Sequence, residues 1–240
     1  MTFQGGNMED EFTKIIEKLI HEILSEAINH DLKYEDFVAA VISAYKYRPK
    51  KMIYAKLISK IENLLGVIRE FSNKYPKLEV NTDELMKNLI SVRRTIGKAY
   101  LIDNLGLPEI YSLTKNFGYL NLSIKVVINR VGNTQTFKNM FGVNYMIELA
   151  RILGAQLITK QDYYIHETFS QWFSYDELLK TMDKLLNRRL LELIRSGPAI
   201  IIADHGYDIE HVAGYYRLCH GYGCQKPLLS LICSFMFISG

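Results

Sequence analysis

The stretch AIIIADHG, residues 199–206, has the composition of a buried strand that ends in an aspartate and a histidine. Two other apolar runs have the same design: AYLID at residues 99–103, and AQLI at residues 155–158, which an aspartate follows after a short gap. Open α/β sheets bind ligands outside the carboxyl ends of their strands. We therefore expect the three aspartates to converge at one edge of a sheet. They are Asp103, Asp162 and Asp204.

The pattern around these runs indicates two parts. After Gly97, short apolar runs alternate with amphipathic segments, which is typical of a parallel sheet with crossover helices. From Phe12 to about Arg94, apolar residues recur instead at the three-and-four spacing of amphipathic helices. We predict an α/β domain over residues 97–240, with a mostly parallel sheet flanked by helices. A small all-helical domain over residues 1–96 precedes it.

Composition agrees with a soluble enzyme, since 48% of the residues are hydrophobic and 23% are charged. The net charge of +3 is too slight to indicate nucleic acid or an anionic membrane as partner, and it excludes neither. Residues 1–10 have neither the basic start nor the apolar core of a secretory signal. The apolar run from Leu228 to Ile238 is well short of the roughly 20 residues of a membrane-spanning helix. We therefore expect a cytoplasmic protein without a membrane partner.

The three cysteines are few, odd in number and clustered near one end of the sequence. Such a set is no disulfide framework and indicates reduced thiols in a reducing compartment. An alternative makes Cys219 and Cys224 zinc ligands beside His220, but a closed structural zinc site usually needs four ligands. We therefore predict that Cys219, Cys224 and Cys233 are reduced and partly buried.

Histidines lie close to the aspartates in sequence. His166 follows Asp162 by four residues, His205 follows Asp204 directly, and His220 lies just downstream. Mixed carboxylate and imidazole ligands suit zinc or manganese, and three imidazoles place zinc ahead. Taken singly, each aspartate is also a common helix cap or turn residue. The complete set is large enough to hold two divalent metal ions.

The order of these motifs resembles that of the alkaline phosphatase superfamily. This superfamily includes nucleotide pyrophosphatase/phosphodiesterases, cofactor-independent phosphoglycerate mutases and the PglZ domains of phage-defence proteins. Besides the aspartate at position 103, the shared elements are Thr-Phe-Lys-Asn at residues 136–139, Asp-x-x-x-His at 162–166, Asp-His-Gly at 204–206 and His-Gly at 220–221. The likeness covers roughly residues 98–240 and implies an alkaline phosphatase-like fold.

The resemblance also implies a role for each matched residue. Thr136 is similar to the nucleophile, and Asn139 to the residue that holds a phosphoryl oxygen. Lys138 stands where the phosphodiesterase branch has proline, so no substrate preference is carried over. The register of the nucleophile stays open, because Thr134 lies two residues earlier and Asn133 could cap the same helix. The implied ligands of one metal are Asp162, His166 and His220, and those of the other are Asp103, Asp204 and His205.

Residue chemistry supports such a site independently. A threonine hydroxyl is a poor nucleophile at neutral pH and needs a metal to stabilise its alkoxide. Backbone N–H groups at the start of a helix favour an approaching phosphoryl or sulfuryl group. We therefore predict a metal-dependent phosphatase or phosphodiesterase. It hydrolyses a phosphate mono- or diester of a small molecule or nucleotide through Thr136.

Two alternatives stay open. Basic and aromatic residues gather at residues 45–51, where Arg48, Lys50 and Lys51 could contact nucleic acid or a protein partner. On that hypothesis the carboxyl-terminal domain is a degenerate PglZ-like binding or scaffold module, although solvated helix ends explain the same cluster. The other alternative is a phosphomutase. Mutases of this superfamily rely on an inserted cap domain, for which the short spans between these motifs leave no room.

Overall fold

The computed structural model describes residues 6–45, 54–74, 82–117, 122–158, 171–188, 190–191 and 199–238. Its centre is a five-stranded sheet with the strand order β2-β7-β4-β1-β3. Every residue of β1 and of β4 is buried, as their unbroken apolar sequences predict. The strands are β1 (Ala99–Ile102), β2 (Leu122–Ile128), β3 (Gln156–Ile158), β4 (Ala199–Ala203) and β7 (Ile232–Ile238).

The sheet is mixed, so the prediction of an α/β architecture is confirmed but that of a mostly parallel sheet is not. β1 pairs in parallel with β3 and β4, whereas β7 is antiparallel to both β2 and β4. No crossover helix separates β4 from β7: the chain makes a hairpin at the carboxyl end of β4 and re-enters the sheet from that edge. Because β7 opposes both neighbours, β2 runs in the same direction as β4. The carboxyl ends of β1, β2, β3 and β4 therefore lie at the same edge of the sheet.

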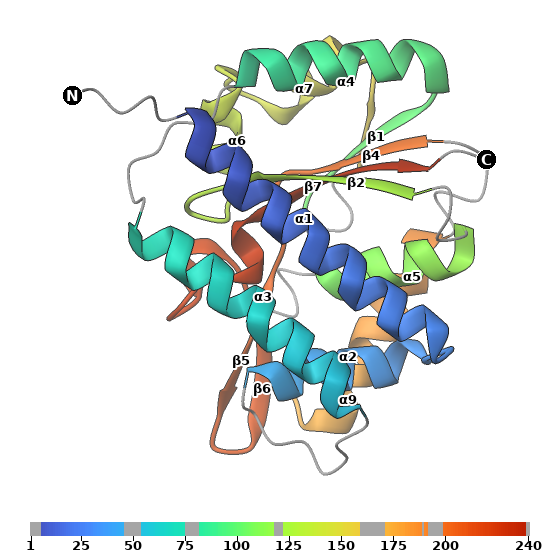
Figure 1. Cartoon of the computed structure of the whole chain (residues 1–240), viewed down its shortest axis with the longest axis vertical. Helices are drawn as coiled ribbons and strands as arrows, with labels where there is room; N and C mark the ends of the chain where they lie inside the picture. Colours follow the sequence, from blue (N-terminus) through green and yellow to red (C-terminus); the bar gives the residue numbers. More distant parts are fainter. Residues whose placement is uncertain are drawn as a thin grey trace.

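Helices cover both faces of this sheet (Figure 1). Ile201 and Ala203 of β4 face a core built with α1, α2, α3 and α5, while Ile200 and Ile202 face a second core built with α4, α6 and α7. This alternation follows from the two-residue period of a strand. The helices are α1 (Gly6–Asn29), α2 (Tyr34–Ala44), α3 (Ala55–Lys74), α4 (Thr82–Ile96), α5 (Leu107–Phe117), α6 (Thr134–Met140) and α7 (Met146–Leu153).

The amphipathic helices expected before Gly97 are present as α1–α4. The core beneath α1, α2 and α3 is continuous with one face of the sheet, and α4 packs on the opposite face. The division of the chain at residue 97 stays a prediction. Within the described residues, no helix combines the length and the apolar character that crossing a membrane requires.

A two-stranded hairpin projects from the carboxyl edge of the main sheet (Figure 1). Its strands β5 (Asp208–Val212) and β6 (Tyr215–Cys219) are joined by Ala213 and Gly214, which both have positive φ, as the tightest hairpin turns require. The helical turn α9 (Tyr175–Thr181) continues into the π-helical segment η2 (Met182–Asn187), and Phe173 just before α9 bridges to Tyr216 of β6. The bridge from Phe173 therefore holds the hairpin along β6.

The prediction of three reduced thiols is wrong for two of the cysteines. Cys219 ends β6, and the short 3-10 helix η3 (Gly221–Gly223) turns the chain back so that Cys224 forms a disulfide with it. Their Cα atoms are 5.3 Å apart, within the range that a disulfide spans. The prediction was based on the number of cysteines, which does not reveal a turn that brings two of them together. Cys233 of β7 is a free, buried thiol.

Candidate metal centre

Asp103, Asp204 and His205 meet at the carboxyl edge of the sheet. β1 and β4 are neighbours in parallel register, with Ile102 opposite Ala203, so the residues that follow them lie side by side. One potential ligand atom from each of the three side chains lies within 4.8 Å of the others. The Nε2 atom of His205 is 3.8 Å from Oδ1 of Asp103 and 3.6 Å from Oδ2 of Asp204. The structure therefore brings together these three of the residues that the sequence singled out as potential ligands.

Asp204 carries a buried carboxylate that protein donors satisfy only in part. Its Oδ1 accepts a 2.9 Å hydrogen bond from the backbone N–H of Asn104. Its Oδ2 is also buried and has no hydrogen-bond partner among the described residues. Burying a carboxylate oxygen without a partner is costly, so such an atom is suited to a cation.

The imidazole of His205 is fully buried and held in one orientation. Its Nδ1 lies 2.8 Å from the carbonyl oxygen of Gly206. Because a carbonyl oxygen can only accept, Nδ1 carries a proton and donates a hydrogen bond to it. Nε2 faces the two carboxylates and, in the neutral ring, is the nitrogen with a lone pair available to a metal. A metal-binding histidine typically has this arrangement, with one ring nitrogen on a carbonyl and the other on the metal.

His220 lies beside this group. Its ring stacks on that of His205, with centroids 4.4 Å apart and an interplanar angle of 24°. Its Nδ1 is 3.2 Å from the carbonyl oxygen of Gly132. Of the ligand set that the resemblance implies for the other metal, His220 alone belongs to the described part of the chain. Asp162 and His166 lie outside the described residues.

Thr134, rather than Thr136, lies at the cluster. The Asn133 side chain caps α6 by accepting a 2.8 Å hydrogen bond from the backbone N–H of Thr136, which makes Thr134 the first helical residue. The Thr134 hydroxyl lies 3.3 Å from Oδ1 of Asp103 and 3.4 Å from Nε2 of His205. Asn139 is exposed and accepts from Gln135. The geometry therefore favours Thr134 where the sequence left the register open.

Asn129, which no sequence pattern singled out, connects the loop before Thr134 to the candidate metal ligands. Its fully buried amide donates to the carbonyl oxygens of Asn133 and Asp204, at 2.8 and 2.9 Å, and its Oδ1 accepts from the backbone N–H of Gly132. The signal that identified the aspartates was available here too, because Asn129 is a polar residue directly after an apolar run. The loop before α6 is thereby tied to the end of β4.

A second buried carboxyl supports the loop that follows His205. Glu109 of α5 accepts hydrogen bonds from the hydroxyls of Tyr207 and Tyr34, at 2.8 and 2.6 Å, and from the backbone N–H of Gly106 at 3.1 Å. Burial raises the pKa of Glu109 from 4.5 to about 7, although these hydrogen bonds act in the opposite direction. Glu109 thus links the loop to α5 and to α2.

The other cluster of potential ligands has no free ligand atoms. It consists of Glu210, Cys219 and Cys224. Arg217 donates two hydrogen bonds to Oε2 of Glu210, and the backbone N–H of Gln225 donates to Oε1. The two sulfurs are joined in the disulfide. This group therefore serves to hold the hairpin rather than to bind a metal.

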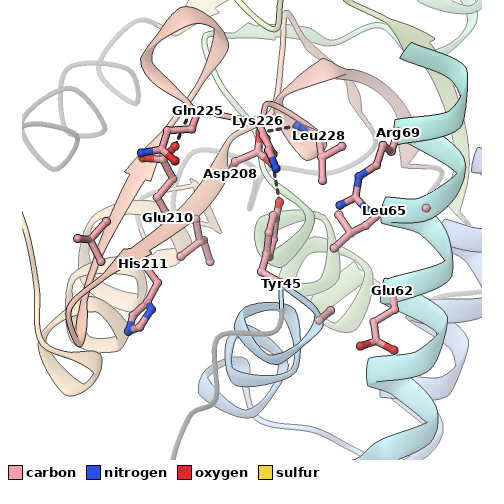
Figure 2. Close-up of a pocket in the computed structure, with 14 residues that line it drawn as sticks. Tyr45, Glu62, Leu65, Arg69, Asp208, Glu210, His211, Gln225, Lys226 and Leu228 are labelled. Carbon is pink, nitrogen blue, oxygen red and sulfur yellow. Dashed lines mark hydrogen bonds between the residues drawn. The ribbon is translucent and has the colours of Figure 1, made fainter. Parts of the chain in front are cut away.

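A cavity of about 600 Å³ lies between α2, α3 and β5 (Figure 2). Tyr45 points across it and donates a hydrogen bond to Asp208, while Arg69 reaches toward it from α3. Asp208 also accepts from the backbone N–H groups at residues 228–230, so its carboxylate is fully engaged. Among its described lining residues the cavity includes none of the metal-centre side chains. It is separate from the candidate site.

The cluster of Arg48, Lys50 and Lys51 lies outside the described residues, so the nucleic-acid alternative has no described surface to support it.

Comparisons of the chain with protein-family models, with curated proteins and with solved structures found no match. The resemblance to the alkaline phosphatase superfamily therefore stays a prediction from its motifs.

Proposed function

We propose that this protein is a metal-dependent phosphoesterase with Thr134 as its nucleophile and with Asp103, Asp204 and His205 as metal ligands. The observation that carries the proposal is the place of the Thr134 hydroxyl. It lies 3.3 and 3.4 Å from two of the proposed donor atoms, on Asp103 and His205. The sequence also predicts a second metal ion, with Asp162 and His166 among its ligands. Because these two residues lie outside the described residues, the proposal includes only the ion at Asp103, Asp204 and His205.

The donor set fits a divalent cation. Two carboxylates, one imidazole and one hydroxyl are ligands that zinc and manganese accept. The buried Oδ2 of Asp204, which has no hydrogen-bond partner among the described residues, gains from a cation because its desolvation is otherwise uncompensated. When bound, the cation would favour the threonine alkoxide and offset charge on a phosphoryl oxygen.

The chain's own residues position the reacting groups. Asn129 and the Asn133 cap fix the start of α6, so the Thr134 hydroxyl faces the ligands without rotation of the helix. His205 is held by Gly206, which keeps its Nε2 directed at the same point. Attack by the Thr134 oxygen forms a phosphothreonine and breaks the bond between phosphorus and the alcohol oxygen. The alcohol leaves with the proton that the threonine hydroxyl loses. Water then hydrolyses the phosphothreonine.

The proposal is tested on the purified full chain after removal of metal with a chelator. Mn²⁺ or Zn²⁺ is titrated back while hydrolysis of an aryl phosphate and of an aryl phosphodiester is followed. We expect turnover that depends on the metal, is lost in Thr134→Ala and persists in the matched control Thr136→Ala. A wild-type chain that neither binds these ions nor hydrolyses either ester would contradict the proposal.

A further inference from the structure

We propose that the disulfide between Cys219 and Cys224 is a positioning device for the metal centre: it closes the loop that carries His220 and holds this ring against His205. The inference rests on the proposed function, because His205 is one of its metal ligands. Cys219 and Cys224 are therefore positioning residues. They act on the site through His220 and touch no substrate.

The disulfide anchors the loop at both ends. Cys219 is the last residue of β6 and pairs with Asp208 of β5, so one sulfur belongs to the hairpin. Cys224 lies five positions later, directly after η3, and both cysteines are buried. His220 comes next after Cys219 and therefore lies inside the closed ring. Ring closure restricts the backbone at His220, and the contacts with His205 and Gly132 orient its side chain.

The opposite side of the loop is packed against the segment that precedes Thr134. His220 Nδ1 contacts the carbonyl oxygen of Gly132 at 3.2 Å. Gly221 has a φ of +52°, and a Cβ at this position would lie 3.1 Å from the carbonyl oxygens of Val131 and Gly132. The two loops therefore lie in close contact at Gly221, where an added side chain would require one of them to move by a few tenths of an ångström. A shift of one loop is transmitted to the other.

Closure of such a short ring acts locally. Few conformations of the unfolded chain are removed when the bonded residues are only five positions apart, so the disulfide adds less to global stability than one closing a long loop. Its main effect is on the placement of His220. We therefore expect its loss to lower metal affinity, and to lower the unfolding temperature less than the loss of a disulfide that closes a long loop would.

The bond has a simple redox balance. Its formation removes two electrons and two protons from the Cys219 and Cys224 thiols, and a small-molecule disulfide accepts them and is cleaved to two thiols. Reduction by a dithiol reverses the reaction. The metal centre is thereby completed in an oxidising environment and loosened in a reducing one.

A double-mutant cycle tests the proposal on the full chain, with Mn²⁺ as the ligand and calorimetric titration as the readout. The Cys219→Ser/Cys224→Ser variant is expected to bind Mn²⁺ about tenfold more weakly than the oxidised wild type, as is typical when support of a metal ligand is lost. His220→Ala is expected to weaken binding as much, and to add nothing in the serine variant, because both changes remove one interaction. Tyr222→Ser, in the same loop but 88% exposed, is the matched control and leaves affinity unchanged.

A second readout separates this inference from the proposed function. In the metal-free wild type, magnetisation transfer between the ring protons of His205 and His220 reports their stacking. We expect these cross-peaks to disappear in the serine variant and on reduction of the wild type with a phosphine. Cross-peaks that persist in the reduced protein, or full additivity in the cycle, would overturn the inference. Persistent cross-peaks do so whether or not the chain binds Mn²⁺.

Discussion

The Thr134 hydroxyl lies 3.3 Å from the Asp103 carboxylate, although the two residues are 31 positions apart and follow different strands. They meet because β1 and β2 end at the same edge of the sheet and because Asn129 draws the start of α6 toward the end of β4. This relationship makes Thr134 the candidate nucleophile.

Replacement of Thr134 by alanine is expected to reduce kcat at least about a thousandfold, since it removes the hydroxyl proposed as the nucleophile. Thr134→Ser keeps a hydroxyl and should retain activity within about tenfold. Steady-state hydrolysis of an aryl phosphate checks both. Thr136→Ala keeps the backbone N–H that Asn133 caps and serves as the control. If Thr136→Ala were the inactive variant, the assignment of the nucleophile would be wrong.

Asp204→Asn is expected to separate stability from metal binding. The neutral amide removes a buried, uncompensated charge, so the metal-free protein should gain about 1 kcal/mol in the free energy of unfolding. The same change weakens the metal site, so the rise in Tm that Mn²⁺ gives the wild type should disappear. Urea unfolding without metal and thermal unfolding with Mn²⁺ measure the two effects. A metal-free variant less stable than wild type would count against an uncompensated carboxylate.

The elements that the sequence predicted best are those whose burial leaves a direct pattern. The runs of β1 and β4 and the aspartates after them were recognisable because both strands are unbroken apolar sequences, buried along their whole length, that end at a polar residue. The direction of β7 was not recognisable, since an apolar run looks the same in either direction. Direction depends on the connection, and a hairpin rather than a helix precedes β7.

The site could be predicted only where one residue type has one plausible role. Asn133, Thr134 and Thr136 all suit the start of a helix, and only the cap hydrogen bond on Thr136 decides which side chain faces the ligands. The Cys219–Cys224 disulfide depends on the turn through Gly221, which the number of cysteines does not reveal. Asn129 also follows an apolar run, but an asparagine there does not indicate a metal ligand as an aspartate does.

Asn129→Ala is expected to lower the free energy of unfolding by about 2 kcal/mol or more. Its amide makes three hydrogen bonds, two of them fully buried, and truncation leaves the carbonyls of Asn133 and Asp204 without this donor. Asn129→Asp is the sharper variant, because it keeps the acceptor for Gly132 and places negative charge against both carbonyls. Urea unfolding should therefore rank wild type above both variants. Equal stability of the wild type and Asn129→Asp would contradict the role of the amide.

Gly66→Ala is expected to stabilise the protein by roughly 0.5–1 kcal/mol. Gly66 lies inside α3, where glycine is a poor helix former, and a Cβ built there meets nothing within 4 Å. Tm should rise by about 2 °C, as expected for a chain of this length. Gly132→Ala is the contrasting control: φ is +70° there, and a Cβ would lie 2.7 Å from the Ser230 carbonyl oxygen, so Tm should fall. A fall in both variants would show that α3 does not tolerate a side chain at position 66.

Glu109→Gln is expected to change the pH dependence of stability. The folded pKa of Glu109, about 7, exceeds its unfolded value of 4.5, so the folded state binds more protons between these values. The stability that Glu109 contributes is complete below about pH 4.5 and is lost as pH rises to about 7. Glutamine has no proton to lose and, with its carbonyl oxygen, can still accept from one of the tyrosines. Between about pH 5 and pH 8 the variant should therefore gain roughly 2 kcal/mol relative to wild type. Urea unfolding at a series of pH values measures this difference, and parallel curves for the two proteins would show that Glu109 titrates normally in the folded state.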